Sequence, residues 1–113
     1  MDGMEVQAVL RWVGLSPFKV RLVIDLVRGR KADEALQILR HLPQAAAKPV
    51  AQVIRSAIAN AEENFGLNRE DLYIARITAD GGPMLKRYRA GARGRAKPIL
   101  RRSSHITVVL QER

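Results

Sequence analysis

Residues 72–110 read LYIARITADGGPMLKRYRAGARGRAKPILRRSSHITVVL, with an alternating segment at each end and a basic segment between them. The first segment, residues 72–80, is predicted to be a strand with four residues on one face: Tyr73, Ala75, Ile77 and Ala79. The last segment alternates in the same way at Ile106, Val108 and Leu110. Two strands on either side of one segment are natural antiparallel partners, so we expect residues 81–102 to form the far end of their hairpin.

The basic segment carries almost all of the net charge of the chain. Residues 81–102 contain eight basic side chains and no acid, whereas the other 91 residues hold 12 basic and 11 acidic groups, a net charge of +1. Charge concentrated in this way indicates a polyanionic partner. The alternative is a solvated basic loop without a dedicated partner. Such a loop does not need the apolar residues Met84, Leu85, Ile99 and Leu100, which suggest packing along the lower part of the arm.

The N-terminal part predicts one strand and three helices. Residues Glu5 to Val13 are β-branched and apolar enough for a strand, with Trp12 expected in the core. Ser16 and Pro17 provide a cap and a first helical residue. The apolar stripe of that first helix, which Gly29 should end, consists of Val20, Val23, Ile24 and Val27. Further helices are predicted from about Asp33 to Leu42 and from about Ala45 to Asn64.

The expected architecture is therefore α+β, with three helices packed on a three-stranded antiparallel sheet and a long basic β-hairpin extension. The 113 residues form one domain, residues 1–113, with the hairpin protruding at 81–102. Without cysteine the chain has no disulfide or thiolate chemistry. Apolar runs are shorter than the ~20 residues of a membrane span, and the acidic N-terminus argues against a secretory signal or a transit peptide. We expect a soluble, cytoplasmic protein.

Two helices carry further polar groups that could contact a polyanion. The first helix and its end bear Lys19, Arg21, Arg28, Arg30 and Lys31, which a solvated helix face explains equally well. On the third helix, polar residues recur every four positions, at Lys48, Gln52, Ser56, Asn60 and Asn64. Because small polar side chains allow close approach, this stripe suits a ribose–phosphate backbone. Neither His41 nor His105 has a neighbour that suggests catalysis, and the acidic pairs resemble surface charge, so we expect no catalytic residue, metal or cofactor.

Three blocks of the sequence together resemble one known family. These blocks are SPFKVRLVIDLVRGR at residues 16–30, SAIANAEEN at 56–64 and GPMLKRYRAGARGRAKPILRRSSHITVVL at 82–110. In this order and spacing they resemble bacterial large-subunit ribosomal protein twenty-two, over nearly the whole chain. The resemblance implies a body on the large-subunit rRNA near the exit of the nascent-peptide tunnel. It also implies a hairpin that threads between rRNA domains, stabilises their packing during assembly and lines the tunnel with its tip.

The resemblance also implies roles for individual residues. The rRNA-binding residues would be Ser16, Pro17, Lys19, Arg21, Arg28, Arg30, Lys31, Lys48, Ser56, Asn60, Asn64, Lys86, Arg87, Arg89, Arg93, Arg95, Lys97, Arg101 and Arg102. The tip that lines the tunnel would consist of Tyr88, Arg89, Ala90, Gly91, Ala92 and Arg93. The chain departs from the family pattern at two places. Ala90-Gly91 replaces a Pro-basic pair, and Ala32 replaces a helix-capping residue, so we expect the start of the second helix to fray.

Alternative interpretations of the sequence predict different binding partners. If the chain is a ribosomal protein, it should contact large-subunit rRNA, neighbouring large-subunit ribosomal proteins and the nascent peptide, but not membrane or DNA. A DNA-bending protein with β-arms is the alternative. Its arms usually carry a wedge near the tip, whereas Pro83 and Pro98 lie away from the centre of this segment. An RNA-processing enzyme would need a convergent cluster of acids, bases or metal ligands that the sequence does not offer.

Overall fold

The chain folds into three helices on a three-stranded antiparallel sheet, with a separate β-hairpin. The computed structural model describes residues 4–81, 85–90, 96–101 and 103–113. The elements in chain order are β1 (Glu5–Val13), α1 (Pro17–Ile24), α2 (Ala32–Arg40), α3 (Ala47–Phe65), a 3₁₀ turn (Arg69–Asp71), β2 (Leu72–Gly81), β3 (Leu85–Ala90), β4 (Ala96–Arg101) and β5 (Ser104–Glu112). The predicted fold class is confirmed.

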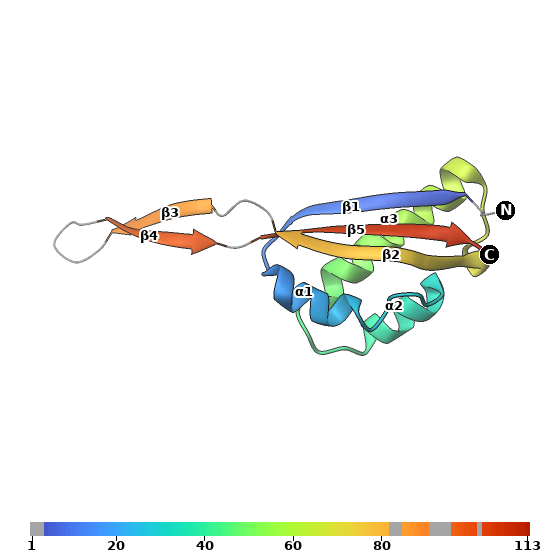
Figure 1. The fold of residues 1–113 in the computed structure, drawn as a ribbon, viewed down its shortest axis with the longest axis horizontal. Helices are drawn as coiled ribbons and strands as arrows, with labels where there is room; N and C mark the ends of the chain where they lie inside the picture. The colour runs from blue at the N-terminus through green and yellow to red at the C-terminus, as the bar shows by residue number, and fades with distance from the viewer. Residues whose placement is uncertain (1–3, 82–84, 91–95, 102) are drawn as a thin grey trace.

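The sheet has the strand order β1-β5-β2, so β5 pairs with an antiparallel neighbour on each side. The strands β3 and β4 form a second, two-stranded antiparallel sheet. β2 ends at Gly81, which pairs with Ser104 at the start of β5. The hairpin therefore leaves from one end of the main sheet and lies beyond that end (Figure 1). The predicted pairing of the two strands that flank the basic segment is confirmed.

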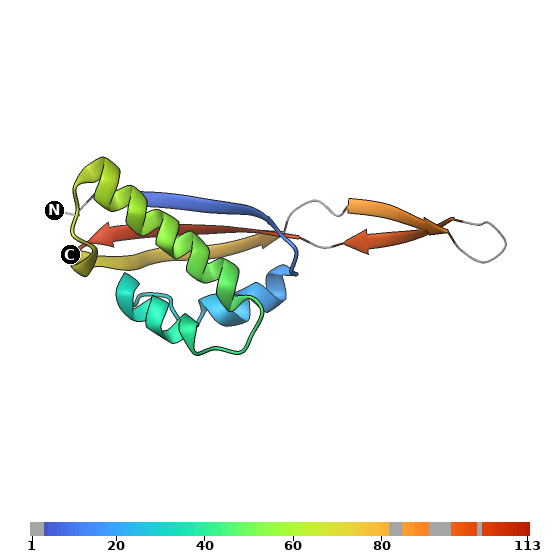
Figure 2. The same cartoon turned by 180° about the vertical axis from the view of Figure 1, so that it is seen from behind.

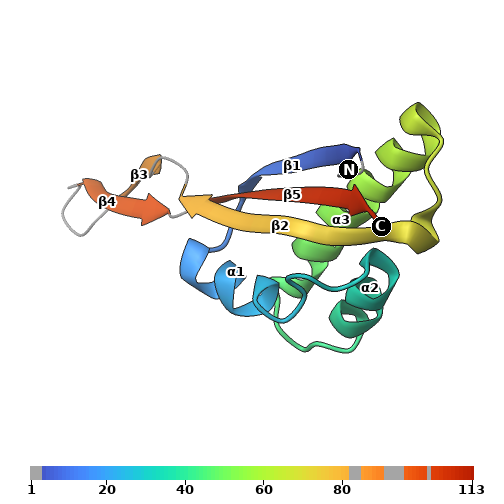
Figure 3. The same ribbon diagram turned by 45° about the vertical axis from the view of Figure 1, so that its right-hand side comes forward.

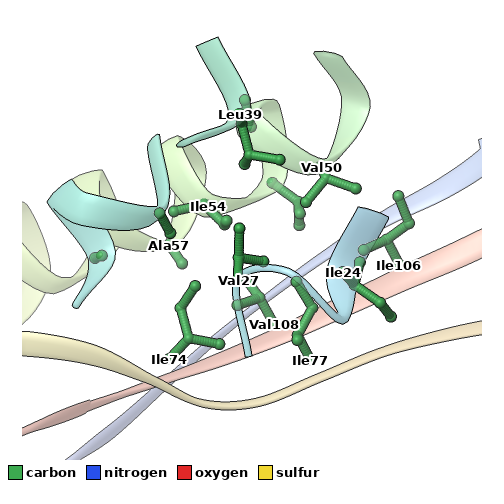
Figure 4. Packing of buried hydrophobic residues seen from close by; sticks show 14 of the residues in the cluster. Ile24, Val27, Leu39, Val50, Ile54, Ala57, Ile74, Ile77, Ile106 and Val108 are labelled. Carbon is green, nitrogen blue, oxygen red and sulfur yellow. The ribbon is translucent and has the colours of Figure 1, made fainter. Parts of the chain in front are cut away.

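The helices cover one face of the main sheet. In the view from behind, α3 crosses in front of β1 and β5 (Figure 2), while α1 and α2 lie along the β2 side (Figure 3). Ile106, Val108 and Leu110 of β5 alternate on the covered face and are fully buried, as expected for a sheet with one covered face, and Val109 between them is also buried. The three alternating residues pack against apolar residues of α1 and α3 such as Ile24 and Ile54 (Figure 4).

Helix α1 is shorter than its apolar stripe suggests. Ser16 is its N-cap, where the hydroxyl accepts a hydrogen bond from the Lys19 backbone N–H at 3.5 Å, and Pro17 is its first residue. The helix ends at Ile24, and a turn with short-range hydrogen bonds follows. This turn keeps Val27 fully buried. Gly29 then adopts φ 79°, a left-handed value that suits glycine, and its N–H donates to the Ile74 carbonyl of β2.

Helix α2 begins differently from the expectation at Ala32. Ala32 is its first helical residue and is fully buried, so it does not occupy the capping position. The N-cap is Lys31, whose carbonyl accepts a hydrogen bond from the Ala35 N–H at 2.9 Å. Lys31 also forms a β-bridge with Tyr73 of β2. The sheet thus fixes the start of α2 without a side-chain cap.

One prediction about β2 was wrong. Tyr73 and Ala75 do not share the buried face with Ile77 and Ala79, because a β-bulge shifts the register between Ile74 and Arg76. One extra residue in the strand reverses the alternation on one side of the bulge. The buried residues before it are therefore Leu72 and Ile74, which are both fully buried, whereas Tyr73 and Ala75 are only half-buried.

The expectation that Trp12 lies in the core was also wrong. A second bulge shifts the register of β1 between Leu10 and Val13, and Trp12 adopts φ 62° within it. The side chain of Trp12 is 55% exposed. Val13 takes the buried position instead.

Candidate nucleic-acid interface

The register of β3 and β4 places four of the five basic residues described in these strands on one face. The pairs Leu85–Arg101, Arg87–Ile99 and Arg89–Lys97 alternate with pairs that begin at Lys86, Tyr88 and Ala90. Because successive strand residues belong to opposite faces, Arg87, Arg89, Lys97 and Arg101 share one face and Lys86 belongs to the other. Tyr88, Arg89 and Ala90 form the distal end of β3. The remaining predicted hairpin residues, Gly91, Ala92, Arg93, Arg95 and Arg102, lie outside the described residues.

Two arginines of the first-helix group attach that helix to β2. The Nε–H of Arg21 donates to the Ala79 carbonyl at 3.0 Å, and Nη2–H of Arg28 donates to the Ile77 carbonyl at 3.1 Å. Both side chains line a shallow depression between α1 and β2. Since a guanidinium has five N–H donors, one such bond orients Arg21 and leaves donors for an anion.

Salt bridges separate the predicted basic residues into two groups. Arg28 pairs with Asp25 at 2.7 Å and Arg30 with Glu34 at 2.8 Å, so part of their charge is neutralised. Among the described residues, Lys19, Arg21, Lys31 and Lys48 form no salt bridge. These four residues are exposed and offer the stronger attraction to phosphate.

The predicted polar stripe of α3 lies on the surface. Lys48, Gln52, Ser56 and Asn64 are exposed, and Asn60 is half-buried. The Asn64 amide donates to the amide oxygen of Asn60. The stripe therefore presents small polar groups on the outside of the helix.

The first predicted residues of α1 lie at the base of the hairpin. A Cβ on Gly81 would lie 3.6 Å from Cγ of Pro17, so the start of α1 touches the strand that leads into the hairpin. The buried hydroxyl of Ser104 donates to the Leu15 carbonyl at 2.5 Å and joins the same region to β5. Ser16 and Pro17 thus connect the helix surface to the hairpin.

Comparison with known proteins identifies the family of this chain. The family model described as "Ribosomal protein L22p/L17e" matches residues 8–111. The chain belongs to this family. It is 54% identical over 110 residues to the large ribosomal subunit protein uL22 of Chloroflexus aggregans, covering 97% of each chain. It is 55% identical over 109 residues to the protein of that name from Dehalococcoides mccartyi, covering 96% of this chain and 100% of the relative.

The L22p/L17e family consists of structural ribosomal proteins, so the chain is not an enzyme. The resemblance of the three sequence blocks to this family is confirmed.

Two of the acidic residues form ion pairs. Asp33 accepts two hydrogen bonds from the Arg69 guanidinium, and Glu34 pairs with Arg30. The hydrogen bond and charge of Asp33 raise the pKa of Arg69. Within the described ranges, His, Asp and Glu form no group of three that could hold a metal, and no helix is long and apolar enough to span a membrane.

A groove between α2 and α3 contains basic residues that the sequence did not single out. Its volume is about 770 Å³, and Arg40 and Arg55 line it together with Lys48. Leu39 and Ala51 also line it. Arg40 ends α2 and Arg55 lies within α3, so only the packing of the two helices brings them together. No spacing along the chain indicates this cluster.

Proposed function

We propose that this L22p/L17e family member is a structural constituent of the large ribosomal subunit in the cytoplasm and binds its rRNA. The observation that carries the proposal is the acid-free segment 81–102, whose paired strands put four basic residues on one face of a hairpin. Each Lys or Arg that neutralises a phosphate releases a condensed counterion and so contributes to affinity. The name of the relatives, large ribosomal subunit protein uL22, supports the choice of subunit.

The body anchors the hairpin in this proposal. Lys19 and Arg21 on α1 and the polar stripe of α3 contact further rRNA segments, so the protein joins rRNA domains during subunit assembly. The hairpin reaches inward, and residues 88–93 at its tip line the nascent-peptide exit tunnel. Neighbouring large-subunit proteins and the passing peptide are then additional partners.

Co-sedimentation tests the proposal. Ribosomal subunits from the source organism are washed in high salt and separated on a sucrose gradient, and the endogenous protein is quantified in each fraction. One copy per large subunit after the wash is expected, because shape as well as charge holds the protein. Release into the soluble fraction, or migration with the nucleoid as expected of a DNA-bending protein, would contradict the proposal.

Crosslinking tests the position of the tip. A photoreactive amino acid at position 90 should crosslink to a nascent chain stalled on the ribosome. The same group at position 59, an exposed alanine on α3, should not. Equal labelling from the two positions, or labelling from neither, would contradict the tunnel assignment while leaving rRNA binding intact.

A further inference from the structure

Trp12 is the single tryptophan of the chain, and a bulge directs it to the surface. Leu10 pairs with Ile106 and Val13 with Ser104, so Arg11 and Trp12 together lie opposite one residue, His105. A bulge of this kind re-aims the side chains within it. Both Arg11 and Trp12 are exposed.

The indole is held in a defined position despite its exposure. The backbone N–H of Trp12 donates to Nδ1 of His105 at 3.1 Å. The imidazole and indole rings meet edge to face, with centroids 4.9 Å apart and planes at 87°. His105 therefore holds the indole in place, and Trp12 remains 55% exposed.

This arrangement has no benefit for the core. A bulky residue with φ 62° is in a conformation that L side chains rarely adopt, and such strain concentrates at functional sites. The exposed tryptophan forgoes the burial that would stabilise the fold. A rigid, exposed aromatic ring beside an arginine is the combination on which unpaired nucleobases stack.

The position of the ring connects it to the basic hairpin. Ser104 pairs with Val13 on one side and with Gly81 on the other, so Trp12 lies at the end of the sheet from which the hairpin leaves. RNA bound along the hairpin would pass this corner. Arg11 next to the ring can neutralise the phosphate of the stacked nucleotide.

We propose that Trp12 is a stacking site for an unpaired nucleobase of RNA, positioned by His105 and assisted by Arg11. The inference rests on the proposed rRNA-binding function and assigns to it a contact with a base, in addition to those with the backbone. Stacking on an aromatic side chain tolerates any base. The site therefore selects single-stranded RNA over duplex and not a particular sequence.

The single tryptophan makes the test direct. The full-length protein is titrated with deproteinised large-subunit rRNA while intrinsic fluorescence and, independently, filter retention of the rRNA are recorded. Heparin, a polyanion without bases, is the control ligand. We expect the rRNA to quench the tryptophan emission in proportion to binding and heparin to bind without such quenching, because only a base can stack.

Variants provide a second measurement. Trp12→Ala should weaken rRNA binding roughly 5- to 150-fold, the range for loss of one base–aromatic stack, while Trp12→Phe should retain most of the affinity. Val9→Ala, at an exposed position in the same strand, should bind like the parent protein. Circular dichroism confirms that each variant is folded.

The outcomes separate this inference from the function on which it rests. Retention of rRNA with unchanged tryptophan emission, or equal quenching by heparin, would overturn the stacking site and leave rRNA binding in place. Failure of the folded protein to retain rRNA would overturn both.

Discussion

The basic residues that share one face of β3 and β4 lead to a quantitative prediction about the salt dependence of rRNA binding. The register puts Arg87 and Arg89 on the face that also holds Lys97 and Arg101, whereas Lys86 belongs to the opposite face. If the basic face contacts phosphates, the double variant Arg87→Gln/Arg89→Gln loses two such contacts. The slope of log K against log salt should then fall in magnitude by about 1.4 to 1.8, from about 0.7 to 0.9 per contact.

This change in slope is large enough to measure. When salt is raised from 50 to 200 mM, two phosphate contacts account for about a tenfold decrease in the binding constant. The binding constant of the parent protein should therefore fall by a factor about ten times larger than that of the variant. The assay is filter retention of large-subunit rRNA at four or more salt concentrations. Lys86→Gln is the matched control, since it removes a neighbouring charge from the other face.

The control decides whether the face matters. We expect Lys86→Gln to change the slope by much less than half of the change in the double variant. If the slope falls by the same amount for each charge removed from either face, the hairpin acts as a diffuse positive rod. The argument from strand register would then be refuted, although the segment would still bind RNA.

Three further predictions concern the body. Ile54→Ala, at a fully buried site of α3, should lower the free energy of unfolding in urea by about 2–5 kcal/mol. The exposed control Gln52→Ala should change this free energy by less than about 0.5 kcal/mol, and equal effects of the two variants would contradict the assigned core. Ser104→Ala removes the buried hydrogen bond to Leu15 and should cost about 1–3 kcal/mol in the same assay. Its control is Ser103→Ala, because the buried Ser103 hydroxyl has no hydrogen-bond partner among the described residues, and that change should be nearly neutral. Lys19→Gln should reduce the magnitude of the salt slope of rRNA binding by about 0.7 to 0.9, whereas Arg30→Gln should change it little because Arg30 is paired with Glu34. A larger effect of Arg30→Gln than of Lys19→Gln would contradict the inference that unpaired basic residues contact phosphate.

Sequence patterns predicted the elements of this fold because local chemistry specifies them. Ser16-Pro17 begins α1 as expected. The residues that recur at helical spacing in α3 are all buried: Val50, Val53, Ile54, Ala57, Ile58 and Ala61. The apolar alternation at Ile106, Val108 and Leu110 likewise matches the covered face of β5. The two alternating segments that flank residues 81–102 predicted the hairpin, and the charge of those residues indicates a polyanionic partner.

Contacts between distant segments were not predictable in this way. The salt bridge between Arg69 and Asp33 and the groove around Arg40 and Arg55 depend on how α2 packs. The attachment of Arg21 to the Ala79 carbonyl depends on where α1 meets β2. Helical spacing describes which residues share a face of one element, but it contains no information about the element opposite.

The two β-bulges explain the predictions that failed, and they differ in consequence. At Ala75 the extra residue in β2 moves Tyr73 off the buried face, but Leu72 and Ile74 replace it, so the core is complete. At Trp12 the bulge removes a large aromatic side chain from the core and the smaller Val13 takes the buried position. Selection for stability alone gives no reason to keep a strained, exposed tryptophan there. A contact outside the chain would give such a reason, and the position of Trp12 at the base of the basic hairpin favours RNA as that partner.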